Sequence, residues 1–244
     1  GTPGVLSYVQ EFGVLPTRNF KYGTNQSWEK LSGDRLATKN STRKKMGLAC
    51  PSCPVGCGRV TKISNPKYAS QGVGPEYETI GLYGSSCFTN DLEVVSKAGF
   101  ICNEMGMDTI SAGSTIACAM ELYEEGYLPL KDAGMPLNFG NAEAVIQLTQ
   151  DMAYRRGFGN ILADGAFRLA SRYGHPEFFM GAKKLEFASY DPRGLQGMGL
   201  GYATNSRGGC HIRGEVQDLS LYGVDYWRIS TDRNLGPVDP LRWD

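Results

Sequence analysis

The chain has 244 residues, and 41% of them are hydrophobic, which is enough for one large domain or two small ones with a buried core. Lysine and arginine total 25, as do aspartate and glutamate, so net charge offers no basis for binding nucleic acid or an anionic membrane surface. No hydrophobic run approaches the roughly 18 residues that a membrane-spanning helix needs. The 7 cysteines, without a signal-peptide pattern, indicate a reducing compartment, and we therefore expect a cytoplasmic protein.

The N-terminal part of the chain shows little periodicity. Residues 14–76 are rich in glycine, proline, asparagine, serine and lysine. This composition is typical of loops, so we expect a loop-rich segment wrapped on a helical body. Only residues 59–63 have the pattern of a short strand.

Three cysteines lie within eight residues of that segment: Cys50, Cys53 and Cys57. The C-x2-C-x3-C spacing is typical of part of the ligand set of a [4Fe-4S] cluster, whose fourth cysteine comes from elsewhere in the chain. Two prolines stiffen the loop, and Gly56 permits a positive φ. Basic residues on both flanks would offset the negative charge of such a cluster. Zinc with a distant fourth ligand, or a loop with incidental thiols, stays open as an alternative.

From residue 90 onward, hydrophobic residues recur at helical spacing. We expect helices at 90–106, 108–126, 141–157 and 160–174, starting at Asn90, Asp108, Asn141 and Asn160 and ending at glycines. The predicted fold class is therefore mainly α and multihelical, with a loop-rich N-terminal and a glycine-rich C-terminal segment.

Seven glycines crowd residues 190–214. Free backbone amides together with Arg193 could hold a phosphate or the edge of a heterocycle. The spacing is not that of a nucleotide-binding loop, and no helix start follows clearly, so a tightly turned loop is the alternative.

Five motifs in order resemble the aldehyde:ferredoxin oxidoreductases, over about residues 1–214: LPTRNF at 15–20, CPSCPVGC at 50–57, GPEYET at 74–79, NEMGMDTIS at 103–111 and RGGCH at 207–211. The resemblance implies a tungsten ion, or more rarely molybdenum, held by two pterins, with a nearby [4Fe-4S] cluster. It also implies oxidation of a small aldehyde to a carboxylic acid, with ferredoxin as electron acceptor.

The same resemblance assigns Cys50, Cys53 and Cys57 as cluster ligands. The family's fourth ligand lies in a D-x-x-G-L-C segment that this sequence does not contain, and Cys210 belongs instead to the motif of the active-site histidine. An N-terminal pterin-binding domain is expected ahead of Gly1. We therefore expect a catalytically silent fragment, with a helical unit at 1–175 and the truncated start of the next at 176–244.

A pterin-contact motif of the family aligns with Asn103, Gly106, Met107 and Asp108. The asparagine replaces an aspartate and retains hydrogen-bonding capacity without the charge. Gly106 as a helix terminator and Asp108 as an N-cap would explain both residues without a ligand. The two roles are compatible, because helix N-termini also bind polar groups.

For catalysis the resemblance indicates Glu78 and His211. A carboxylate near the metal can take the proton of an attacking water, and a histidine can donate a hydrogen bond to the aldehyde oxygen or shuttle the proton. Glu76 is the neighbour with which Glu78 could be confused. His175, followed by proline, is predicted to be a loop residue.

Two other function classes remain open on sequence grounds. One is a cluster-carrying electron-transfer or scaffold subunit, and the other is a zinc-stabilised helical module without catalysis. The sequence also leaves the aldehyde, the choice of tungsten or molybdenum, and the oligomeric state, a homodimer included, undetermined. The positions where some relatives bind an interface iron are Lys97 and Phe100, so we expect no such metal.

Overall fold

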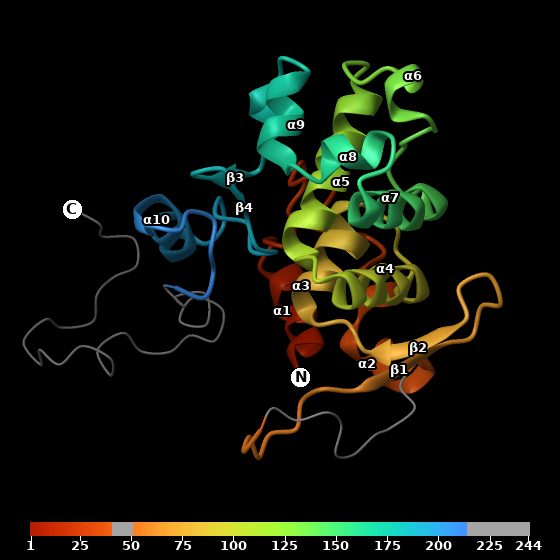
Figure 1. Cartoon of the computed structure of the whole chain (residues 1–244). Coiled ribbons are helices and arrows are strands. Elements are labelled where there is room, and N and C mark those ends of the chain that lie inside the picture. Colours follow the sequence, from red (N-terminus) through yellow and green to blue (C-terminus); the bar gives the residue numbers. More distant parts are fainter. Residues whose placement is uncertain (41–50, 214–244) are drawn as a thin grey trace, which may run out of the picture.

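The computed structural model describes residues 1–40 and 51–213. Helices dominate this part of the chain, which confirms the predicted mainly α, multihelical fold class. Figure 1 shows the helices gathered around α5 (Thr109–Glu124), which contacts η4 (Ile80–Ser86), α7 (Ala142–Tyr154) and α9 (Ala166–Arg172). The β1–β2 hairpin extends on one side, and α10 (Gln196–Thr204) lies on the other.

The N-terminal segment is less irregular than its composition suggests. It begins with η1 (Thr2–Val5), α1 (Leu6–Glu11), η2 (Trp28–Leu31), α2 (Gly33–Arg35) and η3 (Leu36–Asn40). The predicted strand is confirmed as β1 (Val60–Ile63), which pairs antiparallel with β2 (Ser70–Val73) so that Val60 lies opposite Val73. The short helices were missed because none is long enough to display a helical period.

A continuous, buried helical stretch follows this hairpin. It consists of α3 (Tyr77–Thr79) and the π-helical η4 (Ile80–Ser86), and every residue of η4 is buried. The sequence analysis predicted no helix here, and the glycines and serines of the segment have low helix propensity. The missing side chain at Gly84 instead lets Leu31 pack closely, since a Cβ there would lie 2.9 Å from both methyl groups of that leucine.

The predicted pair of long helices is present as α4 (Leu92–Met105) and α5. Gly106 ends α4 with φ 67°, and Asp108 caps α5 by accepting a hydrogen bond from the Ser111 N–H at 2.8 Å. Asn90 as the cap of α4 was wrong. Asp91 takes that role and accepts from the Glu93 N–H at 2.9 Å.

The next predicted helix is α7, capped by Asn141 as expected. Before it lies the short α6 (Leu130–Ala133). A single helix at 160–174 was wrong, because the chain forms α8 (Phe158–Leu162) and α9 (Ala166–Arg172). Gly165 separates them with φ 90°, a backbone conformation that a helix cannot contain.

The C-terminal described part begins with η5 (Pro176–Phe178) and the two-residue strands β3 (Gly181–Ala182) and β4 (Leu185–Glu186). Our expectation of an irregular glycine-rich loop was wrong for residues 196–204, which form α10. Its buried residues, Met198 and Tyr202, anchor this glycine-containing helix to the body. The division into units at 1–175 and 176–244 remains a prediction.

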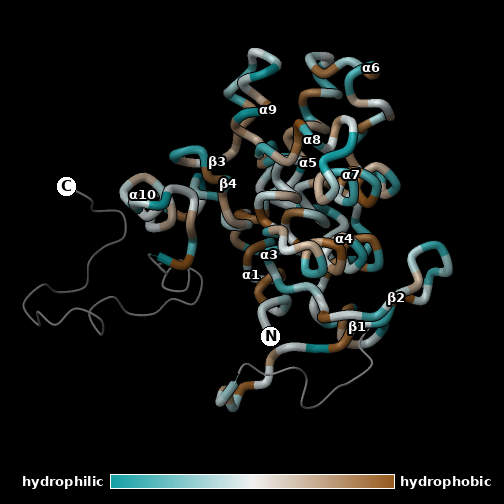
Figure 2. Tube along the Cα trace, viewed as in Figure 1, coloured by the Kyte–Doolittle hydropathy of each residue, from teal (hydrophilic) through white to brown (hydrophobic). Residues whose placement is uncertain are grey.

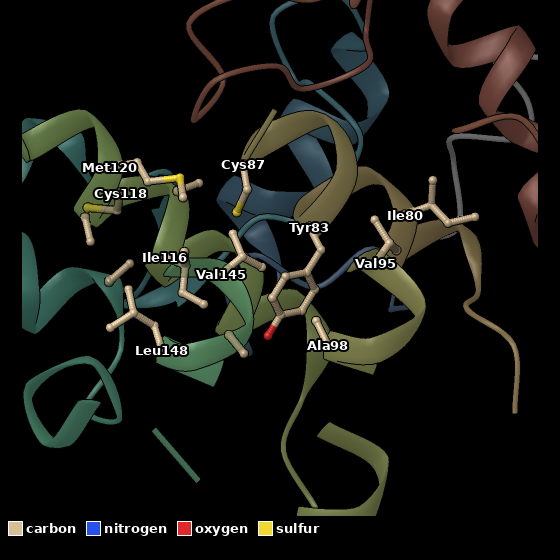
Figure 3. Close-up of a cluster of buried hydrophobic side chains, with 14 of the residues drawn as sticks. Ile80, Tyr83, Cys87, Val95, Ala98, Ile116, Cys118, Met120, Val145 and Leu148 are labelled. Carbon is tan, nitrogen blue, oxygen red and sulfur yellow. The ribbon is translucent and has the colours of Figure 1, made fainter. Parts of the chain in front are cut away.

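One hydrophobic core joins these elements and runs from Leu6 to Tyr202. In Figure 2 the hydrophobic segments concentrate where α4, α5 and α7 meet, and the loop between β1 and β2 is hydrophilic. Figure 3 shows Tyr83 of η4 among side chains of α4, α5 and α7. Its hydroxyl group lies 3.3 Å from the Cys102 Sγ and accepts a hydrogen bond from Thr149 at 3.2 Å, so this buried polar atom is satisfied. Among the described residues, no helix is long and hydrophobic enough to cross a membrane.

Candidate active site

The fold brings together the two side chains that the sequence proposed for catalysis. Glu78 lies on α3, and His211 follows α10 in the chain, yet the Glu78 Oε1 and His211 Nε2 atoms are 3.6 Å apart. Both side chains are largely shielded, with exposures of 15% and 18%. This separation is within the range of an ion pair and is longer than a direct hydrogen bond.

The two oxygens of Glu78 have different surroundings. Oε2 accepts a hydrogen bond from the Ser189 N–H at 2.7 Å, whereas Oε1 is buried and has no hydrogen-bond partner. A carboxylate oxygen that accepts no hydrogen bond and faces a histidine is a suitable acceptor for a proton from a bound molecule.

Burial raises the pKa of Glu78 to about 8, against the lowering effect of the Ser189 N–H, and the negative charge of Asp108 raises it further. A carboxyl group of this kind exchanges its proton near neutral pH. This is the range in which a general acid or base is effective.

Glu76 does not compete for this position. Its carboxylate accepts a hydrogen bond from the Thr2 hydroxyl, and that hydroxyl in turn accepts one from the Tyr77 N–H at 2.9 Å. The geometry therefore distinguishes the two glutamates that the sequence left confusable. His175 stacks on Tyr127 with ring centroids 3.5 Å apart, which gives it a packing role, and its Nδ1 lies 2.8 Å from the Glu177 carboxylate.

The segment that carries His211 rests on the β3–β4 hairpin. A Cβ at Gly209 would lie 2.6 Å from the carbonyl oxygens of both Leu185 and Glu186, so only glycine permits this approach. Gly208 has φ 98°, and a Cβ there would lie 2.2 Å from the Ala182 carbonyl oxygen of the same hairpin. The glycines of the RGGCH motif thus determine where the histidine lies.

Cys210 lies beside His211 and is 8% exposed. Burial would raise the pKa of its thiol, but the backbone N–H groups of Arg213 and Ile212 and the Arg207 guanidinium outweigh burial and lower it. The Arg207 Nη1 lies 3.6 Å from the sulfur.

Of the three clustered cysteines, Cys50 lies outside the described residues. Cys53 and Cys57 are both exposed, and the backbone turns at Ser52 and Gly56, with φ 64° and 54°. Within residues 1–40 and 51–213, no group of three His, Cys, Asp or Glu side chains could hold a metal ion. The predicted cluster ligands therefore remain a prediction.

The residues aligned with the pterin-contact motif form the turn between α4 and α5. Asn103, Gly106 and Asp108 are exposed, and Met107 is half-buried. A cavity of about 310 Å³ opens next to them and is lined by Met107, Asp108 and residues of α5, α7 and α8. Both structural roles expected for Gly106 and Asp108 are present, and the exposed polar groups stay available for a ligand.

Arg193 has a structural partner. It pairs with Asp191 at 2.6 Å and donates to the Phe20 carbonyl group, so its guanidinium ties residues 191–193 to the N-terminal segment. This geometry gives Arg193 a role that needs no cofactor, and its predicted part in cofactor binding is untested.

Three residues near Glu78 were missed by the sequence analysis: Tyr77, Gly81 and Ser189. Tyr77 donates a hydrogen bond to the Ser189 carbonyl group, and Gly81 faces the side chain of Ser189. Tyr77 lies inside the GPEYET motif, which gave a signal for the region, but nothing in the sequence around Ser189 indicates its contact with Glu78.

Comparison with known proteins decides the family. A sequence profile described as "Aldehyde ferredoxin oxidoreductase, domains 2 & 3" matches residues 1–241. The chain belongs to the aldehyde ferredoxin oxidoreductase family. It is 43% identical over 228 residues to a tungsten-containing aldehyde ferredoxin oxidoreductase from Thermococcus kodakarensis, a match that covers 93% of this chain and 37% of that protein. The corresponding protein from Pyrococcus furiosus is 42% identical, with the same coverage.

Two more distant similarities were found. A Pyrococcus furiosus protein named "Aliphatic sulfonate oxidoreductase, WOR-like subunit" is 31% identical over 133 residues, covering 54% of this chain and 21% of that protein. The solved BamBC active-site complex of benzoyl coenzyme A reductase shares the fold with a TM-score of 0.61 at 23% identity, over 78% of this chain and 29% of that one. The chain thus spans little more than a third of the length of its closer relatives, as a fragment would.

Proposed function

We propose that this chain is part of an enzyme that oxidises an aldehyde to a carboxylic acid, with Glu78 and His211 as its proton-transferring residues. The observation that carries the proposal is the buried Glu78 Oε1, which accepts no hydrogen bond and faces the His211 Nε2 at 3.6 Å. The names of the relatives supply the substrate class, the tungsten and the electron acceptor ferredoxin.

The residues present are compatible with the cofactors that the family implies. Exposed thiols at Cys53 and Cys57, with a backbone turn at Gly56 between them, suit thiolate ligation of a [4Fe-4S] cluster, in which Cys50 would be the third ligand. The exposed turn from Asn103 to Asp108 offers polar groups to a pterin. When bound, tungsten bis-pterin would accept two electrons from the aldehyde, and the cluster would pass them on singly to ferredoxin.

The proton chemistry lies with this chain's own residues. Conversion of an aldehyde and water to an acid releases two electrons and two protons, so a group must take the proton of the water as its oxygen bonds to the carbonyl carbon. The ionised Glu78 carboxylate accepts that proton at Oε1. His211 donates a hydrogen bond from Nε2 to the aldehyde oxygen and so polarises the carbonyl group.

The test uses the full-length protein that carries this chain, assayed for aldehyde-dependent reduction of a viologen dye. Glu78→Gln and His211→Asn should each lower kcat by at least 100-fold, in line with the usual contribution of a general acid or base. Glu76→Gln and His175→Asn make the same chemical changes outside the site and should retain activity. Wild-type kcat in both site variants would refute the assignment.

Metal analysis tests the cofactors separately. About one tungsten and about four iron atoms per full-length chain, with a low-temperature EPR signal of a reduced [4Fe-4S] cluster, would support the proposal. Zinc as the only metal would refute it and favour the zinc-stabilised helical module.

A further inference from the structure

A tight backbone turn holds one oxygen of Glu78 while the other faces His211. The Tyr190 N–H donates to the Ala188 carbonyl oxygen at 2.7 Å, which folds residues 188–190 around Ser189. We call residues 188–190 the Ser189 turn. Its central N–H donates to the Glu78 Oε2 at 2.7 Å, although the two residues are 111 positions apart in the sequence.

The helical stretch that carries Glu78 also holds this turn in place. The hydroxyl group of Tyr77, which is 1% exposed, donates to the Ser189 carbonyl oxygen. Gly81 leaves open the space that the Ser189 side chain occupies, because a Cβ there would overlap the Ser189 Oγ and lie 2.6 Å from its Cβ. One turn of helix therefore supplies the carboxylate and both restraints on its hydrogen-bond donor.

The side chain of Ser189 contributes no hydrogen bond. Ser189 is fully buried, and its Oγ has no partner. The contact to Glu78 and the contact from Tyr77 both use backbone atoms of this residue. The position of the peptide, and not the hydroxyl group, is therefore what matters to Glu78.

We propose that the Ser189 turn positions the catalytic carboxylate, with Tyr77 and Gly81 as positioning residues that keep the turn against Glu78 so that Oε1 faces His211. The catalytic significance of this arrangement rests on the function proposed above. The geometric part can be tested on the chain alone.

The proton affinity of Glu78 reports on the arrangement. Burial raises its pKa, the Ser189 N–H lowers it because that donor favours the ionised form, and the charge of Asp108 on the first turn of α5 raises it. The other titratable groups near Glu78 are Tyr77 on the same helix, Tyr202 on α10, and His211. If the turn moves away, the lowering influence is lost while the others remain.

The test is a carbon-13 NMR titration of the Glu78 carboxyl group in this chain, assigned by its absence in Glu78→Gln. Gly81→Ala should displace the turn and raise the pKa of Glu78 by about one, a tenfold change in its protonation constant. Tyr77→Phe removes only a hydroxyl group and should raise the pKa of Glu78 by less than Gly81→Ala does. Ser189→Ala keeps the N–H and should leave the pKa unchanged.

Gly84→Ala is the matched control, because it adds the same methyl group to η4 but meets the side chains of Leu31 and Val95. The proposal is overturned if Gly81→Ala and Tyr77→Phe both titrate like wild type, or if Ser189→Ala shifts the pKa as much as they do. Tyr77→Phe decides the matter if Gly81→Ala does not fold. In the full-length protein, the pH of half-maximal aldehyde oxidation should move with the pKa, and a carboxyl shift without any such activity would refute the proposed function alone.

Discussion

At the scale of single residues, Glu78 couples the fold to pH. Its pKa is about 8 in the folded chain and near the ordinary 4.5 when unfolded, because burial disfavours the charged form. Between these two pKa values, Glu78 therefore keeps its proton in the folded state and has lost it in the unfolded state. The resulting stabilisation is complete below pH 4.5 and is lost as pH rises through 8.

Glu78→Gln should remove this loss. Glutamine has a similar shape without the charge, so the variant should gain stability relative to wild type as pH rises from 4.5 to 8. The gain should be on the order of a few kcal/mol. Urea unfolding of the chain at both pH values measures it. Glu104→Gln, on the exposed surface of α4, controls for general effects of charge. The expectation would be contradicted if the free energies of unfolding of Glu78→Gln and wild type differed by the same amount at both pH values.

Single residues also show how far sequence reasoning reaches. Glu78 and His211 were proposed through short motifs that resemble those of the family. The Ser189 turn was missed because its contribution is a backbone N–H, which any non-proline residue provides. Arg193 was predicted to bind a ligand, but the sequence also contains the carboxylate that pairs with it, Asp191, two residues earlier.

At the scale of elements, the turn between α4 and α5 has a structural role that stability measurements can separate from a ligand-binding role. Asp108→Ala should cost about 1 kcal/mol through loss of the cap on the Ser111 N–H, and Asp108→Asn, which can still cap, should cost much less. Asn103→Ala, on the exposed end of α4, should leave stability unchanged. Denaturant unfolding of the chain tests all three variants. If Asn103 contacts a pterin, its alanine variant should instead lower the pterin content of the full-length protein.

The β3–β4 hairpin and the glycines that rest on it form a second element with a measurable role. Gly209→Ala would place a methyl group 2.6 Å from two backbone carbonyl oxygens, which cannot move as readily as a side chain. The His211 segment should therefore shift away from Glu78, and NMR contacts between the two side chains should weaken.

Gly201→Ala on α10 is the control for this substitution, because a Cβ there meets no atom within 4 Å. It should be neutral or stabilise the chain by up to about 1 kcal/mol, as alanine usually does inside a helix. Unchanged contacts between Glu78 and His211 in Gly209→Ala would show that the hairpin does not position the histidine.

Elements were predictable where local signals were strong. The long helices α4, α5 and α7 have hydrophobic periods and capping residues, so their existence followed from the sequence, and the error at Asn90 was one residue. The helix α10 has glycines at three positions, and its stability comes from the burial of Met198 and Tyr202 against the body. Tertiary packing of this kind overrides propensity and cannot be read from the segment itself.

At the scale of the whole molecule, the candidate site depends on segments distant in sequence. Glu78 comes from the segment after the β1–β2 hairpin, its hydrogen-bond donor from residue 189, and its partner from residue 211. One hydrophobic core connects these parts, so the site forms only when the described body folds as a unit. The exposed cysteines and the exposed turn at 103–108 lie at its surface, where other groups can reach them.

The Glu78–His211 site lies within the folded body, whereas the candidate cofactor ligands lie at its surface. We therefore predict that the titration of Glu78 can be observed without aldehyde oxidation. Residues 1–244 alone contain Glu78 and His211 but span only 37% of the length of their relatives. We expect the isolated chain to retain the Glu78 titration and yet to give no aldehyde-dependent viologen reduction, because the family resemblance implies that other segments help to hold the pterins and the cluster. An anaerobic assay with the full-length protein as positive control tests this. Aldehyde-dependent dye reduction by the purified chain would show that it holds a complete redox centre by itself and would refute the expectation.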